Sequence, residues 1–459
     1  MFRALSILVC LSLFCAIPSP NFAQAAERTP NIIFILADDL GYGDLGCYGQ
    51  KMISTPNLDR MAREGIRFTN FYAGSTVCAP SRASLMTGLH QGHAYIRGNA
   101  TLVPVPGQSG QAARPLSLRP QDVTVAELLR AAGYSTGLIG KWGLGEPETT
   151  GVPNRKGFDY FFGYLNQTHA HNYYPDYLWR NEQRVPLAKG MYSHDLFTGE
   201  ALEFIRHNRA RPFFLYLAYT IPHANNELRR VTGNGMEVPT DAPYSDKPWP
   251  AQQKNYAAMV TRMDADIGKV LGLLKELALD NDTVVFFSSD NGPQGVGEGG
   301  FNPDFFASHG VFRGIKRDLY EGGIRVPMIV RWRAKIKAGQ TNGRVCAGWD
   351  FMATAAALAG VKPPAGIDGI SMLPSFLGQK QKDHEYLYWE FHEGGFAQAV
   401  RLGNWKAIRK GKNGQIELYD LQTDIKESRD VSASHPEIAR RVEEIMKSAR
   451  TESEFWPAR

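Results

Sequence analysis

An apolar run at residues 31–37, Asn-Ile-Ile-Phe-Ile-Leu-Ala, constrains the fold more than any other feature of this chain. Its β-prone side chains lack a polar alternation, which predicts a strand buried on both faces, as in a parallel sheet covered by helices on both sides. Similar strand-like runs follow at 134–140, 212–218, 283–289 and 327–332. Helical segments separate several of these runs, so we expect an α/β sandwich with a large, mainly parallel sheet flanked by helices.

The helical segments carry recognisable ends. Thr55-Pro56 predicts a helix start, with Gly65 at its end, and Thr124 with Glu127 forms a capping box that opens another helix. A long amphipathic helix is predicted at 256–277, where apolar residues recur every three or four positions. That spacing is typical of a face packed on the core. We assign these residues to packing.

The composition changes near residues 361–369, where Pro363, Pro364, Gly366 and Gly369 indicate a boundary or long connection. Beyond it, short strand-like runs at 385–391, 397–401, 406–409 and 417–419 precede an amphipathic helix near 436–448. We therefore expect a large domain at 26–362 and a smaller C-terminal subdomain at 363–459, in which a helix covers an antiparallel sheet.

Residues 1–25 resemble a cleavable secretory signal peptide. Arg3 precedes an apolar stretch too short to span a bilayer comfortably, and Ala23 and Ala25 provide the small residues of a cleavage site. A membrane anchor fits less well, so we expect no stable membrane insertion after cleavage and a periplasmic or secreted protein. A net charge of +5 over 459 residues, without blocks of like charge, gives no reason to expect nucleic-acid binding.

Two pairs of oxygen-bearing residues follow predicted strands. Asp38-Asp39 closes the first strand and Asp290-Asn291 closes a much later one. The carboxyl ends of parallel strands are where ligands bind, and hard oxygen ligands suit Ca²⁺, or Mg²⁺ with more retained water. Either pair alone would also fit a turn or a helix cap.

Cys78 stands out among the cysteines. Cleavage of the leader would leave Cys47, Cys78 and Cys346, which is too few for a disulfide framework. Cys78 begins the segment Cys-Ala-Pro-Ser-Arg, which favours a helix start, where unpaired N–H groups stabilise an anion. An ordinary buried thiol and a reactive thiolate are the other interpretations, although no histidine in this stretch could activate the thiol.

The segment 78–88, Cys-Ala-Pro-Ser-Arg followed by Leu-Met-Thr-Gly, resembles the signature of the type I sulfatases, in which a maturation enzyme oxidises the cysteine to formylglycine. Residues 133–142, Gly-Tyr-Ser-Thr-Gly-Leu-Ile-Gly-Lys-Trp, resemble that family's second signature. The resemblance extends from Pro30 to about Leu421. It implies the alkaline-phosphatase-like fold and points to bacterial polysaccharide-sulfate sulfatases.

The resemblance also implies roles for individual residues. It assigns one calcium ion to Asp38, Asp39, Asp290 and Asn291, and it has Arg82 and Lys141 hold the hydrated formylglycine made from Cys78. It has His223 and Lys316 hold the sulfate oxygens and help protonate the leaving alcohol. The chemistry of ester hydrolysis supports these roles, because a dianionic transition state requires clustered positive charge and an alkoxide leaving group requires a proton.

One position departs from the family pattern. The family often has Gly-Lys-Trp-His, whereas this chain has Gly140-Lys-Trp-Gly143. Either another histidine takes the place of the missing one, with His90, His93 and His169 as candidates, or the role is dispensable here.

The expected substrate is a sulfated sugar, preferably with sulfate on a galactose-type residue, although an aryl sulfate ester would suit the same chemistry. Segment 166–177 is rich in aromatic and hydrogen-bonding side chains that suit a sugar, and a second such cluster lies at 389–395. The aromatic residues would equally fit an interface between domains. The candidate substrate-binding residues are His171, His309, His392 and Glu393.

Two other functions remain open from the sequence. A phosphonate or phosphate ester hydrolase of the same superfamily could use the same metal, lysine and histidine residues. A non-catalytic carbohydrate-binding relative would have lost residues that are intact here, among them Arg82, Lys141 and Lys316.

Overall fold

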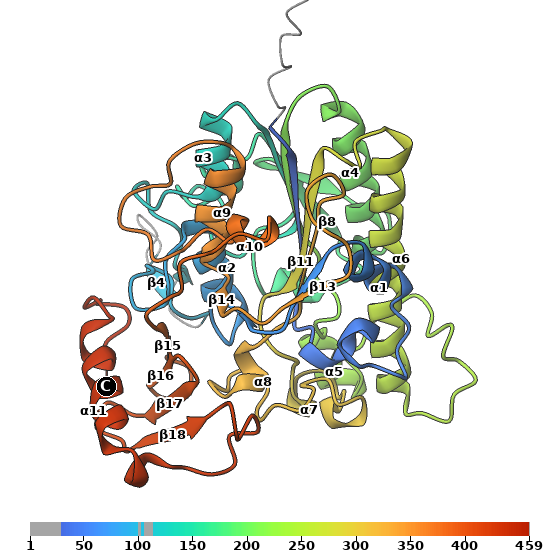
Figure 1. The fold of residues 1–459 in the computed structure, drawn as a ribbon. Coiled ribbons are helices and arrows are strands. Elements are labelled where there is room, and N and C mark those ends of the chain that lie inside the picture. Colours follow the sequence, from blue (N-terminus) through green and yellow to red (C-terminus); the bar gives the residue numbers. More distant parts are fainter. Residues whose placement is uncertain (1–28, 100–101, 105–112, 459) are drawn as a thin grey trace, which may run out of the picture.

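Ten strands form the central sheet of the computed structural model, which describes residues 29–99, 102–104 and 113–458 (Figure 1). The predicted signal peptide lies outside these residues. The order across the sheet is β13 (Gln340–Asn342), β2 (Ile66–Phe68), β12 (Met328–Arg331), β11 (Thr283–Ser289), β1 (Asn31–Ala37), β10 (Phe213–Ala218), β6 (Ser135–Lys141), β7 (Tyr160–Tyr164), β8 (Tyr177–Arg180) and β9 (Gln183–Pro186).

The centre of this sheet is parallel. Strands β11, β1, β10, β6 and β7 pair in parallel, and the register places Ala37 beside Ser289. The pairs β11–β12, β12–β2, β7–β8 and β8–β9 are antiparallel, while β13 and β2 are parallel. The predicted mainly parallel sheet is therefore confirmed. The strand expected at 327–332 exists but runs antiparallel to its neighbour β11.

Helices cover both faces of the sheet (Figure 1). The helices are α1 (Pro56–Glu64), α2 (Cys78–Thr87), α3 (Val125–Ala131), α4 (Ser193–Asn208), α5 (Asn226–Thr232), α6 (Ala251–Glu276), α7 (Val296–Gly299), α8 (Glu321–Ile324), α9 (Asp350–Leu358), α10 (Leu373–Phe376) and α11 (Pro436–Ser448). None of these described helices has the length and apolar composition needed to cross a bilayer.

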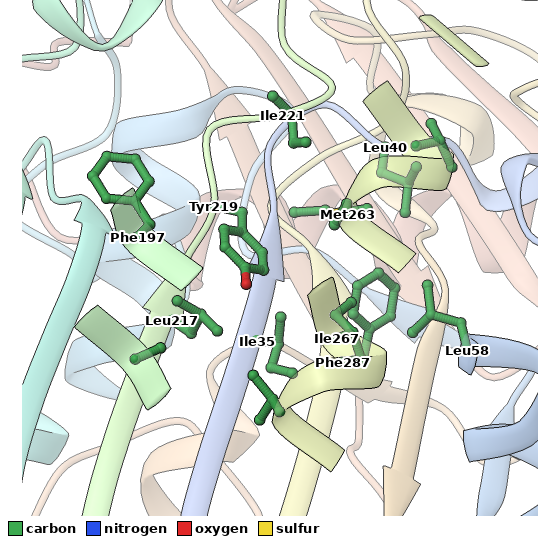
Figure 2. Close-up of a cluster of buried hydrophobic side chains, with 14 of the residues drawn as sticks. Ile35, Leu40, Leu58, Phe197, Leu217, Tyr219, Ile221, Met263, Ile267 and Phe287 are labelled. Carbon is green, nitrogen blue, oxygen red and sulfur yellow. The ribbon is translucent and has the colours of Figure 1, made fainter. Parts of the chain in front are cut away.

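Strand β1 is buried on both faces, as its sequence predicts. Ile33 and Ile35 pack into the core beneath α4 and α6, where Figure 2 shows Ile35 near Leu217, Ile267 and Phe287. Ile32 and Phe34 pack into the opposite core with residues of α2, α3 and α9. The two cores hold the carboxyl ends of the central strands in fixed register, because close-packed side chains resist displacement.

A separate four-stranded antiparallel sheet lies near the C-terminus, with the order β15 (Leu387–Phe391), β16 (Ala397–Leu402), β17 (Trp405–Lys410) and β18 (Ile416–Asp420). Helix α11 covers it through Val442, Ile445 and Met446. These elements match the predicted runs. Preceding them, α10 packs against the core of the large sheet through Phe376. The remaining pairs are short: β3 (Phe71–Tyr72) with β14 (Cys346–Ala347), and β4 (Leu102–Pro104) with β5 (Ala113–Pro115).

Buried charges join the C-terminal sheet to α8. Lys406 Nζ on β17 lies 3.1 Å from Glu321 Oε1 and 3.2 Å from Glu427 Oε1. The Glu321 backbone N–H donates to Glu427 Oε2. Burial, together with the nearby carboxylate of Glu321, raises the pKa of Glu427 to about 7 even though Lys406 opposes the shift.

This network predicts an unusual pH dependence of stability. The folded-state pKa of Glu427 lies above its ordinary value near 4.5. The contribution of this group to the stability of the fold is therefore fully present below pH 4.5 and is lost as pH rises through about 7. Between those pH values, the free energy of unfolding of the wild type should decline by about 3 kcal/mol because of Glu427. We expect Glu427→Gln to remove this decline. Thermal unfolding from pH 5 to 8 measures this decline, with Glu437→Gln, at an exposed position of α11, as control. Identical pH profiles for wild type and Glu427→Gln would contradict the prediction.

Candidate active site

Four neighbouring strands bring the site together at their carboxyl ends. Asp38 and Asp39 follow β1, Asp290 and Asn291 follow β11, and Lys141 is the last residue of β6. His223 lies in the loop after β10. Parallel pairing places these ends at one edge of the sheet, as predicted. The N-terminus of α2 adds Cys78 and, one turn later, Arg82.

The oxygen-bearing residues form a buried cluster. The Asp39 backbone N–H donates to Asp290 Oδ1 over 3.1 Å, and Asn291 Nδ2 donates to Asp39 Oδ1 over 2.7 Å. Asn291 Oδ1 is buried and makes no hydrogen bond to any described residue. Asp38, Asp39, Cys78 and His223 also offer ligand atoms within 4.8 Å of one another. The donor set suits a hard divalent cation, because carboxylates dominate it and the free Asn291 oxygen lacks a partner.

Cationic side chains surround these carboxylates. Lys141 Nζ lies 2.7 Å from Asp38 Oδ2, and Arg82 Nη2 lies 2.8 Å from Asp290 Oδ2. Lys316 Nζ lies 2.8 Å from Asp39 Oδ2 and 3.2 Å from His223 Nε2. All of these side chains are nearly inaccessible to solvent. The site therefore concentrates fixed charges where water cannot screen them.

Burial and the neighbouring charges shift the carboxyl pKa values in opposite directions. Burial would raise the pKa of Asp38, but Lys141, His223 and Arg82 outweigh it and hold that pKa well below its usual range. Burial and the Asp38 carboxylate raise the pKa of Asp290 to about 7, despite Arg82. Close carboxylates disfavour one another's charge, so a bound cation would stabilise the ionised form of Asp290.

His223 is held as a neutral ring with a defined tautomer. Its Nδ1 donates to the carbonyl oxygen of Ala224 over 2.7 Å, which leaves Nε2 to accept from Lys316 Nζ. Burial first, and Lys316 second, lower the pKa of His223 well below its usual value. For Lys316, the charge of Asp39 outweighs burial and raises the pKa. The pair thus keeps its proton on Lys316.

The Cys78 thiol points into the carboxylate cluster. Its Sγ lies 3.3 Å from Asp38 Oδ1. Burial and the charge of Asp38 raise the pKa of the thiol well above its ordinary value, although Lys141 and Lys316 oppose the shift. A reactive thiolate requires a lowered pKa, so this environment opposes the thiolate interpretation.

His171 lies beside the cluster of buried carboxylates and cations. Its ring stacks on that of His223 with centroids 4.7 Å apart, and its Nδ1 lies 3.0 Å from Glu227 Oε2 on α5. Burial and the charge of Lys141 lower its pKa. His171 is thus the histidine that contacts the cluster from the segment 166–177.

The three histidines proposed to replace the one missing at Gly143 lie elsewhere. His90 and His93 stack on each other and face Asp368 beyond the end of α2. That ten-residue helix separates them from Cys78 by roughly 15 Å. His169 packs against the rings of Tyr164 and Tyr177.

The glycine at position 143 has a local explanation. Its φ of +75° is unfavourable for other residues, and an added Cβ would lie 1.9 Å from Gln167 Nε2. The Gln167 side chain therefore fills the space beside Gly143, and its buried Nε2 makes no hydrogen bond within the described ranges of the chain. The sequence gives no pattern that would identify Gln167.

The other candidate substrate contacts are peripheral or packed. His309 Nε2 lies 3.0 Å from Asp304 Oδ1. His392 Nε2 lies 3.0 Å from Glu390 Oε1, and its ring packs against Phe396 and Trp456. None of the described contacts joins either histidine to Cys78.

Two glutamates extend the charged region around Lys316. Glu393 Oε2 lies 3.5 Å from Nε of Arg317, the neighbour of Lys316. Glu298 Oε2 on α7 lies 3.2 Å from Lys316 Nζ, and its other oxygen contacts Arg317. Sequence reasoning missed Glu298 and Glu227. Both lie in short loop-flanked helices without a recognisable motif.

Comparisons with known proteins agree with this site. The profile of the sulfatase family matches residues 30–361, and the profile described as N-sulphoglucosamine sulphohydrolase, C-terminal, matches residues 307–452. Human N-acetylgalactosamine-6-sulfatase is 34% identical over 414 residues, which cover 84% of this chain and 72% of the relative. N-acetylgalactosamine-6-O-sulfatase of Bacteroides thetaiotaomicron is 30% identical over 515 residues, covering 93% and 94%.

A solved structure shares the architecture. Ps i-CgsB in complex with k-i-k-neocarrahexaose superposes with a TM-score of 0.78 and 30% identity, covering 94% of this chain and 95% of that chain. The family profile spans most of the chain, including the strand ends and α2 that form the site. The chain therefore belongs to the sulfatase family and is an enzyme that hydrolyses sulfate esters.

Proposed function

We propose that the enzyme removes sulfate from a sulfated carbohydrate, with formylglycine made from Cys78 as its nucleophile and one calcium ion in its site. The observation that carries this proposal is the position of Cys78 Sγ, at the N-terminus of α2 and 3.3 Å from Asp38, within a ring of buried cations. A maturation enzyme would have to act on Cys78 before the chain folds, because the side chain is buried afterwards.

The proposed calcium ligands are Asp38, Asp39, Asp290 and Asn291. The free Oδ1 of Asn291 and the raised pKa of Asp290 support a cation at this position. When bound, calcium supplies positive charge that offsets the carboxylates and the charge of a sulfate group. Formylglycine, as its hydrate, supplies an oxygen nucleophile that a buried thiol of raised pKa does not provide.

The remaining residues orient the ester and supply a proton to its leaving group. Arg82 and Lys141 hold Asp290 and Asp38 and direct positive charge toward residue 78. Lys316 carries a proton at Nζ beside the neutral Nε2 of His223, so this pair can deliver a proton to the leaving alkoxide. Preorganised cations in a site closed to water stabilise developing negative charge more strongly than solvent does.

The carbohydrate assignment follows from the relatives and from His171. Two relatives are named as N-acetylgalactosamine-6-sulfatase and N-acetylgalactosamine-6-O-sulfatase, and the similar Ps i-CgsB structure is a complex with k-i-k-neocarrahexaose. We propose a galactose-type residue bearing sulfate as the substrate. The His171 ring and the Glu227 carboxylate can hydrogen-bond to ring hydroxyls beside the sulfate. The predicted leader supports a periplasmic or secreted location.

Turnover of matched sulfate and phosphonate esters tests the proposal, together with His171→Ala. We expect the sulfate ester to be preferred. We also expect His171→Ala to lower kcat/KM on a sulfated galactose-type sugar by about 10- to 100-fold, with a smaller loss on an aryl sulfate. His207→Ala, at an exposed position of α4, is the control. Preference for the phosphonate would refute sulfatase specificity, and equal losses on both sulfates would refute a sugar contact by His171.

A further inference from the structure

A pocket with a volume of about 490 Å³ lies between the C-terminal sheet and the large sheet. Three segments line it: 342–345 after β13, 383–387 leading into β15, and 401–404 at the turn between β16 and β17. None of the proposed catalytic or calcium-binding residues borders this pocket. Its volume is within the range of small-ligand sites.

Arg401 is the buried cation of this pocket. Its side chain is 5% exposed, its Nε donates to Gly403 O over 3.1 Å, and its Nη1 donates to the Tyr72 hydroxyl. No carboxylate of the described chain lies within 4.0 Å of its guanidinium. Arg82, Arg97 and Arg331, by contrast, are similarly buried and each has a carboxylate oxygen within 2.8 Å.

The nearest carboxylate in this hydrogen-bond network belongs to Glu321, which Arg401 reaches only through Tyr72. The Tyr72 hydroxyl donates to Glu321 Oε2 over 2.6 Å, so it accepts from Arg401. Lys406 and Arg325 already pair with the same carboxylate at 3.1 Å. Glu321 thus faces two nearer cations, and the described part of the chain leaves the charge of Arg401 without a counterion.

The rest of the pocket does not supply that counterion. Arg344 adds a second guanidinium, and its partner Asp383, at 2.5 Å, is largely exposed to solvent. His384 pairs with Asp350, 2.8 Å away. Burial lowers the pKa of Arg401 to about 10, so the side chain is still charged at neutral pH. A buried charge without a partner costs free energy that a bound anion would recover.

We propose that this pocket is a second, non-catalytic site that binds a sulfate group, with Arg401 at its base and Arg344 at its rim. A guanidinium matches sulfate well because its planar N–H groups can donate in pairs to two oxygens. The sulfate can be free sulfate ion, the product of the reaction, or an ester on a sugar unit. Asn342 and Asn404 line the same pocket, and amide side chains of this kind suit sugar hydroxyls.

Selenate, a heavier analogue of sulfate, tests the site directly. Crystals of the full chain grown without oxyanions and soaked in selenate should show an anomalous peak against Arg401, in addition to any peak near Lys316. Absence of the peak at Arg401 under saturating selenate would overturn the proposal. This test is independent of catalysis, so failure of the carbohydrate assignment would not affect it.

Calorimetric titration then separates the two sources of sulfate. The probes are sodium sulfate, a sulfated oligosaccharide and its desulfated counterpart, with wild type, Arg401→Gln, Arg344→Gln and the exposed control Arg206→Gln on α4. We expect both pocket variants to weaken one binding event at least about tenfold and to retain turnover of an aryl sulfate. Weaker binding of the sulfated oligosaccharide alone identifies the sulfate ester as the ligand. Weaker binding of both sodium sulfate and the sulfated oligosaccharide identifies the sulfate ion.

Because Arg401→Gln also removes hydrogen bonds to Tyr72 and Gly403, its melting temperature must be measured alongside binding. Arg344 lies at the rim and its change should leave folding intact. Unchanged affinity in a folded Arg344→Gln and a folded Arg401→Gln would refute the site.

Discussion

Cys78→Ala is expected to lower turnover of every sulfate ester by about 10⁴-fold or more, because it removes the proposed nucleophile while leaving the surrounding charges in place. Wild-type protein produced with a maturation enzyme should contain a peptide whose mass shows formylglycine at residue 78. The loss should appear in kcat rather than KM, since His223 and Lys316, the residues proposed to hold the sulfate oxygens, keep their positions beside Asp39.

Cys47→Ser provides the matched control for this experiment. Cys47 is half-buried, lies outside the cluster and has its pKa raised by burial and Asp59, so its change should leave turnover near the wild-type value. Fully active wild-type protein containing only unmodified cysteine at position 78 would rule out the proposed nucleophile.

Removal of calcium is expected to abolish turnover. Without a cation, Asp38, Asp39 and Asp290 place three carboxyl groups in one buried region, and burial together with the Asp38 carboxylate raises the pKa of Asp290 to about 7. Asp290→Ala should also abolish turnover, because it removes a proposed ligand and the partner of Arg82. Chelation followed by titration with Ca²⁺ and Mg²⁺ measures the requirement and identifies the preferred ion.

Asn291→Ala tests the proposed metal site separately from the buried cations. Its Oδ1 has no partner in the described chain, and its Nδ2 contacts Asp39 and Gly292 but no proposed catalytic cation. We expect the Ca²⁺ concentration for half-maximal activity to rise at least about tenfold, with activity restored at saturating Ca²⁺. Asp304→Ala, at an exposed position, is the control. Full activity of rigorously metal-free wild type would exclude the calcium site.

Much of the fold and the centre of the site were predictable from local sequence. The apolar run 31–37 predicts burial on both faces because no alternation assigns a polar face, and Ile32 and Ile33 indeed enter opposite cores. Thr124 and Glu127 form the predicted capping box around α3. Cys78 opens a helix that Gly88 ends in a left-handed conformation. Such features depend on neighbours a few residues away.

The sequence by itself therefore determined the α/β sandwich, the C-terminal sheet and the strand-end residues, because parallel strands must place their carboxyl ends together. Only the tertiary structure decided which distant side chains meet. In the folded chain, His171 stacks on His223, whereas His90, His93 and His169 lie elsewhere. Lys316 pairs with Asp39, 277 positions away in the sequence, and His392 faces Glu390. The fold also leaves Arg401 without a paired carboxylate among the residues that the structure describes. Loop paths and long-range packing determine these contacts, and neither leaves a periodic signal in the chain.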